Sequence, residues 1–144
     1  MIKSEKHLLL EALFTHVTES IIVAGYDGKI QLTNPATEKL FGYTHDELVG
    51  KTVEFLMPER FASRHMQHRS GYNNKPHARS MGIGMDLYAK KKDGSEFPVE
   101  ISLTPFNSGD EKYVIAFLID ITLRKKAEQR IIENKKEKLL NFQY

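Results

Sequence analysis

Cysteine is absent from this 144-residue chain, which excludes disulfides, thiolate nucleophiles and cysteine-bound zinc. The chain also lacks an apolar run of about 18 residues or more, so the sequence predicts no membrane span. Its first segment, Met1 to His7, is too polar for a signal peptide. Together these absences favour a cytoplasmic location.

The body of the chain has almost no excess of positive or negative charge. The net charge is only +2, and the segment from Leu123 to Tyr144 carries seven basic against three acidic residues. The rest of the chain holds 14 basic and 16 acidic residues, so the basic excess belongs to the tail. We interpret the tail as the solvated face of a helix and predict no nucleic-acid partner. With 40% hydrophobic and 28% charged residues, the composition is that of one ordinary globular domain.

A predicted antiparallel hairpin between Met81 and Leu103 organises the chain. Apolar residues alternate with small or polar ones in two runs, which is the pattern of strands with one buried face. The apolar positions are Met81, Ile83, Met85 and Leu87 in the first run, and Phe97, Val99, Ile101 and Leu103 in the second. Asp93-Gly94 lies between the runs and favours a tight hairpin turn. We expect the apolar face to form a core that other segments cover.

The N-terminal part is predicted to be an amphipathic helix over residues 4–17, followed by two short strands. The helix has an apolar stripe at Leu9, Leu10, Leu13, Phe14 and Val17. The strands cover residues 20–24 and 29–33, and Asp27-Gly28 joins them as a second hairpin. Because so apolar a stripe is unsuited to water, we expect this helix to pack on the outer face of a sheet and to contribute to a dimer.

Short helices follow the second strand. Asn34 is a favourable N-cap, Pro35 suits the first helical position, and the helix is expected to end at Gly42. Thr44 and Glu47 have the spacing of a capping box, which predicts a one-turn helix ending at residue 50. A short apolar turn at 53–57 and a longer helix at 59–72 complete this part of the chain.

The last predicted strand, residues 112–120, is apolar on both faces. One face carries Tyr113, Ile115, Phe117 and Ile119, and the other carries Val114, Ala116 and Leu118. Such a strand needs a cover on both sides. We expect Ile115 and Phe117 to point into the helix-covered interior with Met85, Ile101 and Leu103. After Thr122 the pattern predicts a charged helix to the end of the chain.

Several motifs in this order resemble a PAS domain with its C-terminal sensory-box extension, over roughly residues 8–123. They are Asp27-Gly28-Lys29-Ile30 before Asn34-Pro35-Ala36, Leu40-Phe41-Gly42-Tyr43 before Glu47-Leu48-Val49-Gly50-Lys51, Lys92-Asp93-Gly94-Ser95-Glu96-Phe97-Pro98-Val99, and Asp120-Ile121-Thr122. The resemblance implies an α+β fold with a five-stranded antiparallel sheet in the order 2-1-5-4-3. Helices would cover the inner face and enclose a small cavity. Residues 1–17 would be an N-terminal helix, 18–122 the PAS domain and 123–144 a C-terminal signalling helix.

The resemblance also implies a function. Proteins of this family sense a ligand, light, redox state or partner and pass the signal through the C-terminal helix, often to a histidine kinase. The chain is therefore expected to be a homodimeric regulatory module, not an enzyme, and no nucleophile elbow, P-loop or zinc motif contradicts this. Candidate lining residues for a small apolar ligand are Met81, Ile83, Met85, Leu87, Ile101, Leu103, Ile115 and Phe117. Candidate relay residues are Asp120, Ile121 and Thr122.

The sequence predicts no cofactor or metal, but haem and noncovalent flavin are alternatives that it does not exclude. Arg64-His65 resembles the haem-binding helix of oxygen-sensing PAS domains, in which the His at this position ligates iron. The position of that subfamily's oxygen-binding Arg holds Met85 here, and a thioether can itself ligate haem iron. The photoadduct chemistry of light-sensing relatives needs a cysteine and is excluded, which leaves only noncovalent flavin. A haem-based gas sensor and a ligand-free dimerisation module are the alternative functions.

Overall fold

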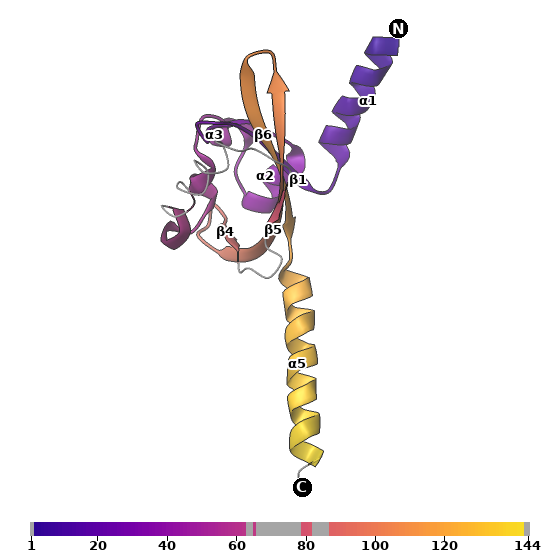
Figure 1. Cartoon of the computed structure of the whole chain (residues 1–144), viewed down its shortest axis with the longest axis vertical. Helices are drawn as coiled ribbons and strands as arrows, with labels where there is room; N and C mark the ends of the chain where they lie inside the picture. The colour runs from indigo at the N-terminus through magenta and orange to yellow at the C-terminus, as the bar shows by residue number, and fades with distance from the viewer. Residues whose placement is uncertain (1, 63–64, 66–78, 82–86, 143–144) are drawn as a thin grey trace.

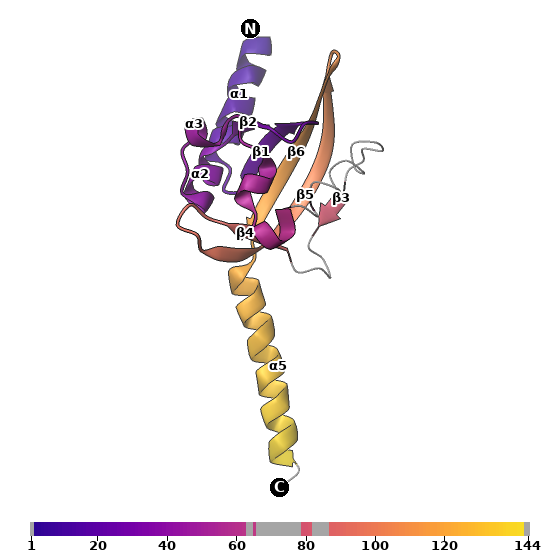
Figure 2. The same cartoon turned by 90° about the vertical axis from the view of Figure 1, so that its left-hand side faces the viewer.

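An antiparallel sheet forms the centre of the protein (Figures 1 and 2). The computed structural model describes residues 2–62, 65, 79–81 and 87–142. The strands are β1 (Ser20–Gly25), β2 (Ile30–Thr33), β3 (Arg79–Met81), β4 (Tyr88–Lys90), β5 (Glu96–Ser108) and β6 (Glu111–Asp120). Their order is β2-β1-β6-β5, and β3 and β4 pair with successive parts of β5. Since β3 and β4 share one position, the predicted five-stranded order 2-1-5-4-3 is confirmed.

Helices cover one face of the sheet and extend from the body at both ends (Figure 1). The helices are α1 (Ile2–His16), α2 (Pro35–Phe41), α3 (His45–Leu48), the 3-10 helix η1 (Val53–Leu56) and α5 (Thr122–Phe142). Residues 59–62 and 65 are helical as well, while the rest of the predicted 59–72 helix lies outside the described residues. None of the helices described is long and apolar enough to cross a membrane.

The short helices form where the capping residues predict them. Asn34 Oδ1 accepts the Thr37 N–H at 3.2 Å at the start of α2, and Gly42 ends that helix at φ 83°. Thr44 and Glu47 form the predicted capping box at α3, with reciprocal bonds of 3.2 and 3.0 Å. These local signals determine where the two helices begin, and Gly42 determines where α2 ends.

The hydrophobic core lies between the short helices and the inner face of the sheet. Its buried members are Ile22, Ile30, Phe41, Leu48, Leu56, Ala89, Phe97, Val99 and Leu118. Phe41 of α2 and Phe97 of β5 have ring centroids 5.6 Å apart and join the two layers. Burial of apolar side chains from both layers is the main favourable contribution to the stability of this arrangement.

The turn predicted at Asp93-Gly94 is confirmed, but the strand that precedes it is β4 at residues 88–90 and not the predicted run 81–87, of which 82–86 lie outside the described residues. Gly94 donates its N–H to the Lys91 carbonyl at 2.9 Å, with φ at 88°, a conformation that glycine adopts without strain. Asp93 accepts bonds from the Ser95 hydroxyl and N–H, which lower the pKa of the Asp93 carboxyl. The strand β5 continues beyond the expected end at Leu103, and with β6 it forms an arm that projects past β1 (Figure 1).

The facing expected for β6 is wrong. Ile101 pairs with Leu118 and Leu103 pairs with Ala116, and directly paired residues share a face of the sheet. The inner face of β6 therefore carries Leu118 and Ala116, whereas Ile115 and Phe117 lie on the outer face. Because both faces of this strand are apolar, its residue pattern contains no signal for which face is inside.

The free edge of β2 is covered by the segment after α3. Ile30 exchanges backbone bonds with this segment, donating to Lys51 at 2.8 Å and accepting from Gly50 at 2.9 Å. Val53 donates to the Gly28 carbonyl at 2.9 Å, and residues 29 and 52 form an isolated bridge. The free edge of β2 thus has its hydrogen-bonding groups satisfied within the chain at Ile30.

Candidate functional site

The junction between β6 and α5 has the side-chain cap that the sequence predicts. Asp120 Oδ1 accepts the Thr122 N–H at 2.9 Å and the Thr122 hydroxyl at 2.5 Å. A carboxylate at this place satisfies a free N–H of the first helical turn and suits the positive end of the helix dipole. Ile121 is 5% exposed, and its N–H donates to the Pro98 carbonyl at 3.0 Å. The three residues hold the start of α5 against β5.

Beyond its first turns, α5 has little contact with the sheet. Arg124 forms an ion pair with Glu100 of β5, which secures the first turn. The apolar side chains further along the helix are exposed, among them Ile131, Ile132, Leu139 and Leu140. In Figures 1 and 2 the helix runs away from the body. Its direction is therefore determined at the junction.

The candidate cavity residues divide into three groups. Leu87 and Ile101 pack against the core, and Leu103 lies half-buried on the same face as Ile101. Ile83 and Met85 lie outside the described residues, while the backbone of Met81 pairs with Ile101. Ile115 and Phe117 belong to the outer face, so they do not line the interior. The inner wall that the described residues form is thus narrower than expected.

His65, the candidate haem ligand, lies beside a carboxylate that the sequence pattern did not indicate. Its Nδ1 is 3.8 Å from Glu54 Oε1, and the Glu54 side chain is only 7% exposed. Arg60, in the helical segment 59–62, donates two bonds to Glu96 of β5, at 2.8 and 2.6 Å. This pairing lowers the pKa of the Glu96 carboxyl, and it ties the segment to the sheet.

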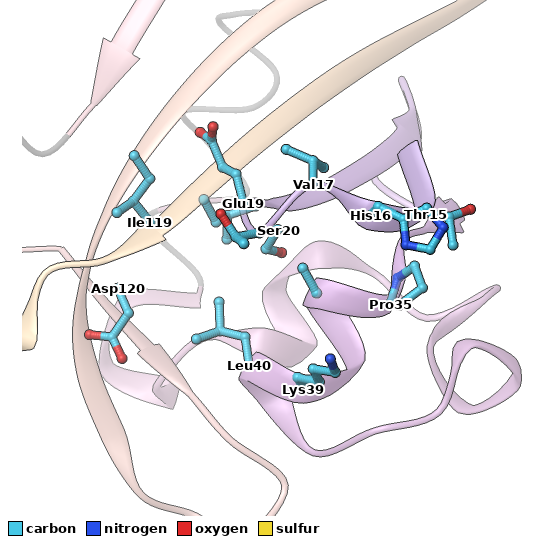
Figure 3. A pocket seen from close by; sticks show the side chains of 13 residues that line it. Thr15, His16, Val17, Glu19, Ser20, Pro35, Lys39, Leu40, Ile119 and Asp120 are labelled. Carbon is cyan, nitrogen blue, oxygen red and sulfur yellow. The ribbon is translucent and has the colours of Figure 1, made fainter. Parts of the chain in front are cut away.

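A cleft lies between the connection from α1 to β1 and the end of β6, where α5 begins (Figure 3). It has a volume of about 680 Å³. Its lining comes from the α1–β1 connection, one side of α2 and the end of β6: Thr15, His16, Val17, Thr18, Glu19, Ser20, Pro35, Ala36, Lys39, Leu40, Leu118, Ile119 and Asp120. The sequence does not reveal this cleft, because its walls come from three segments distant in the chain.

The comparison with protein families agrees with this architecture. The family model described as the PAS fold matches residues 8–121. Among solved structures, the PAS domain of an HTR-like protein from Haloarcula marismortui superposes with a TM-score of 0.70 at 27% identity, covering 82% of this chain and 93% of that one. The chain belongs to the PAS family, whose fold is a regulatory sensory module.

Curated relatives are signalling proteins. The chain is 34% identical over 128 residues to the sensor protein FixL of Bradyrhizobium diazoefficiens, covering 89% of this chain and 25% of FixL. It is 25% identical to the oxygen sensor protein DosP of Escherichia coli, covering 81% and 14%. It is 23% identical to the cell-division control histidine kinase PdhS of Brucella ovis, covering 89% and 12%. The chain thus spans a quarter or less of these relatives and has the sensory signalling role of their shared domain.

Proposed function

We propose that this chain is the input module of a larger signalling protein, in which α5 transmits the state of the PAS domain to a C-terminal output domain such as a histidine kinase. The observation that carries the proposal is the junction of Asp120, Ile121 and Thr122, which holds only the first turn of a long exposed helix. A small shift of β6 would change the direction of the whole helix. The similarity to PdhS supports a kinase as output. The test is kinase output from Asp120 variants.

The signal that the domain receives is proposed to be a small apolar ligand or a partner protein. Leu87, Ile101 and Leu103 present apolar surface towards the inner side of the sheet, where such a ligand would bind. We expect the module to work without a bound cofactor. We also expect the protein to be cytoplasmic.

A homodimer is the proposed assembly. Within one chain α1 packs on α2 and leaves Leu8, Leu9, Leu10 and Leu13 exposed. The outer face of the sheet is also apolar, with Ile21, Val23, Leu32, Ile115, Phe117 and Ile119 on β1, β2 and β6. Two apolar surfaces that one chain leaves open are complementary if α1 of one copy covers the sheet of the other.

We therefore expect Leu13→Glu to convert the dimer into a monomer, because Leu13 is 58% exposed and would face an apolar partner surface. Deletion of residues 1–16 should have the same effect or cause aggregation. The measurement is sedimentation equilibrium, and Ala12→Glu, the same charge at an exposed position of the helix that is not part of the apolar stripe, is the matched control. A soluble dimer of unchanged affinity after the deletion would exclude α1 from the interface.

Haem-based sensing through His65 is the second candidate function. Two observations favour it: Glu54 lies on the Nδ1 side of His65, and the chain is similar to a protein named as an oxygen sensor. When bound, haem would supply iron as the binding site for a gas. Glu54 would orient the imidazole so that Nε2 faces away from the carboxylate.

Addition of hemin to the purified protein separates the two candidates. The cofactor-free relay predicts a colourless protein that gains no sharp Soret band, and this is the result we expect. Haem sensing predicts a band that His65→Ala removes and that His68→Ala, a change at a neighbouring histidine, retains. Such a band would contradict the cofactor-free relay and identify His65 as the haem ligand.

A further inference from the structure

The connection from α1 to β1 is tied to α2 by a single buried side chain, that of Asn34. Asn34 has no exposed surface. Its Oδ1 accepts bonds from the Ile21 N–H at 2.9 Å, the Thr37 N–H at 3.2 Å and the Thr37 hydroxyl at 2.9 Å. These bonds cap α2 and attach it to β1, as expected of an N-cap residue.

The amide nitrogen of the same side chain points the other way, towards the end of α1 and the connection to β1. Asn34 Nδ2 donates to the Phe14 carbonyl at 3.2 Å and to the Glu19 carbonyl at 3.0 Å. Phe14 lies in the last turn of α1, where backbone carbonyls have no partner inside the helix. Asn34 therefore caps the end of α1 and the start of α2 at once, and both of its N–H donors are used.

This double cap lies next to the α5 junction. Ser20 opens β1, pairs with Leu118 of β6, and shares a hydrogen bond of 2.7 Å with the Thr37 hydroxyl. Leu118 is two residues before Asp120, the cap of α5. The cleft in Figure 3 shows the same proximity, because the α1–β1 connection and the end of β6 form two of its walls.

We propose that Asn34 is a positioning residue that fixes the direction of α1 and couples it, through the β1–β6 pair, to the direction of α5. A force or contact applied to α1 by a neighbouring domain or partner would then reach the output helix without any ligand in the core. The coupling to α5 rests on the proposed relay function, while the fixing of α1 does not.

The sharpest test is Asn34→Asp, which keeps the shape and the Oδ1 acceptor but replaces the two N–H donors by a carboxylate oxygen. That oxygen would face the carbonyls of Phe14 and Glu19, so α1 should be released while α2 keeps its cap. Asn34→Ser is the second variant, since serine still caps α2 and lacks the donors without adding charge. Thr44→Ala is the matched control, because it removes a helix cap of the same kind at α3, which packs on β2.

The chain has no native cysteine, so spin labels can be placed at introduced cysteines without background. The readout is the distance distribution between labels at Ala12→Cys on α1 and Gln31→Cys on β2, with labelled protein diluted into unlabelled protein. A second pair, Lys126→Cys on α5 with Gln31→Cys, reports on the output helix. We expect Asn34→Asp and Asn34→Ser to at least double the width of the α1 distribution and to shift that of α5, and Thr44→Ala to change neither.

Asn34→Asp and Asn34→Ser both remove the donors to the carbonyls of Phe14 and Glu19, and only Asn34→Asp adds a charge. Broadening of the α1 distribution in both variants would therefore identify the loss of these donors as its cause. The proposal is overturned if both variants keep the wild-type α1 width, if Thr44→Ala broadens it equally, or if α5 does not respond.

Discussion

Phe41→Ala should lower the free energy of unfolding by about 3–5 kcal/mol, because it leaves a cavity at the centre of the core. Phe41 is 0% exposed and packs against Phe97, so its ring is the main contact between α2 and β5. Urea denaturation followed by circular dichroism measures the loss. The midpoint of unfolding should fall with little change in the slope.

Phe55→Ala is the matched control for this result. The same change of side chain at a position that is 38% exposed should cost roughly 1 kcal/mol, since less apolar surface is removed from the interior. Phe55 has a ring contact with Tyr43 at 5.1 Å, so the burial of the ring and not its pairing is what differs. Equal losses at the two positions would mean that Phe41 is not at the centre of the core.

Asp120→Ala should leave the domain folded but separate output from input. Loss of the cap is expected to cost about 0.5–2 kcal/mol, which a domain with this core tolerates. The first N–H of α5 would lose its side-chain acceptor, so the angle between α5 and β6 would be held only by the Ile121–Pro98 bond and the Arg124–Glu100 ion pair. The measurement is autokinase activity, with and without stimulus, of a protein in which a histidine kinase domain follows α5. We expect the difference between the two states to disappear.

Two variants sharpen the interpretation of that assay. Asp120→Asn keeps an acceptor oxygen at the same place and should retain most of the switching. Asp110→Ala, in the exposed turn between β5 and β6, removes the same carboxylate far from α5 and should behave as wild type. If Asp120→Ala still switches with full amplitude, the junction is a structural cap and the relay is elsewhere.

Local signals explain why much of the fold could be predicted from sequence. Asp93-Gly94 and Asp27-Gly28 form tight turns whatever surrounds them, and Asn34 and Thr44 cap helices through bonds to residues three positions away. The acceptor role of Asp120 at α5 is local in the same way. Such interactions depend on a few neighbouring residues, which a sequence displays directly.

Features that depend on distant segments could not be predicted. The inward face of β6 is decided by its pairing with Ile22 of β1 and Ile101 of β5, because its own residues are apolar on both sides. The donors of Asn34 bond carbonyls 15 and 20 residues away, and carbonyls are identical in every residue. Glu54 beside His65 is likewise a product of packing, in an apolar turn that offered no sign of a buried carboxylate.

The covered edge of β2 restricts how this protein can aggregate. Another chain cannot add a strand at Ile30, because this residue already exchanges its N–H and carbonyl with Lys51 and Gly50. Growth of a continuous intermolecular sheet across this residue, the first step towards a fibril, would require the segment after α3 to detach.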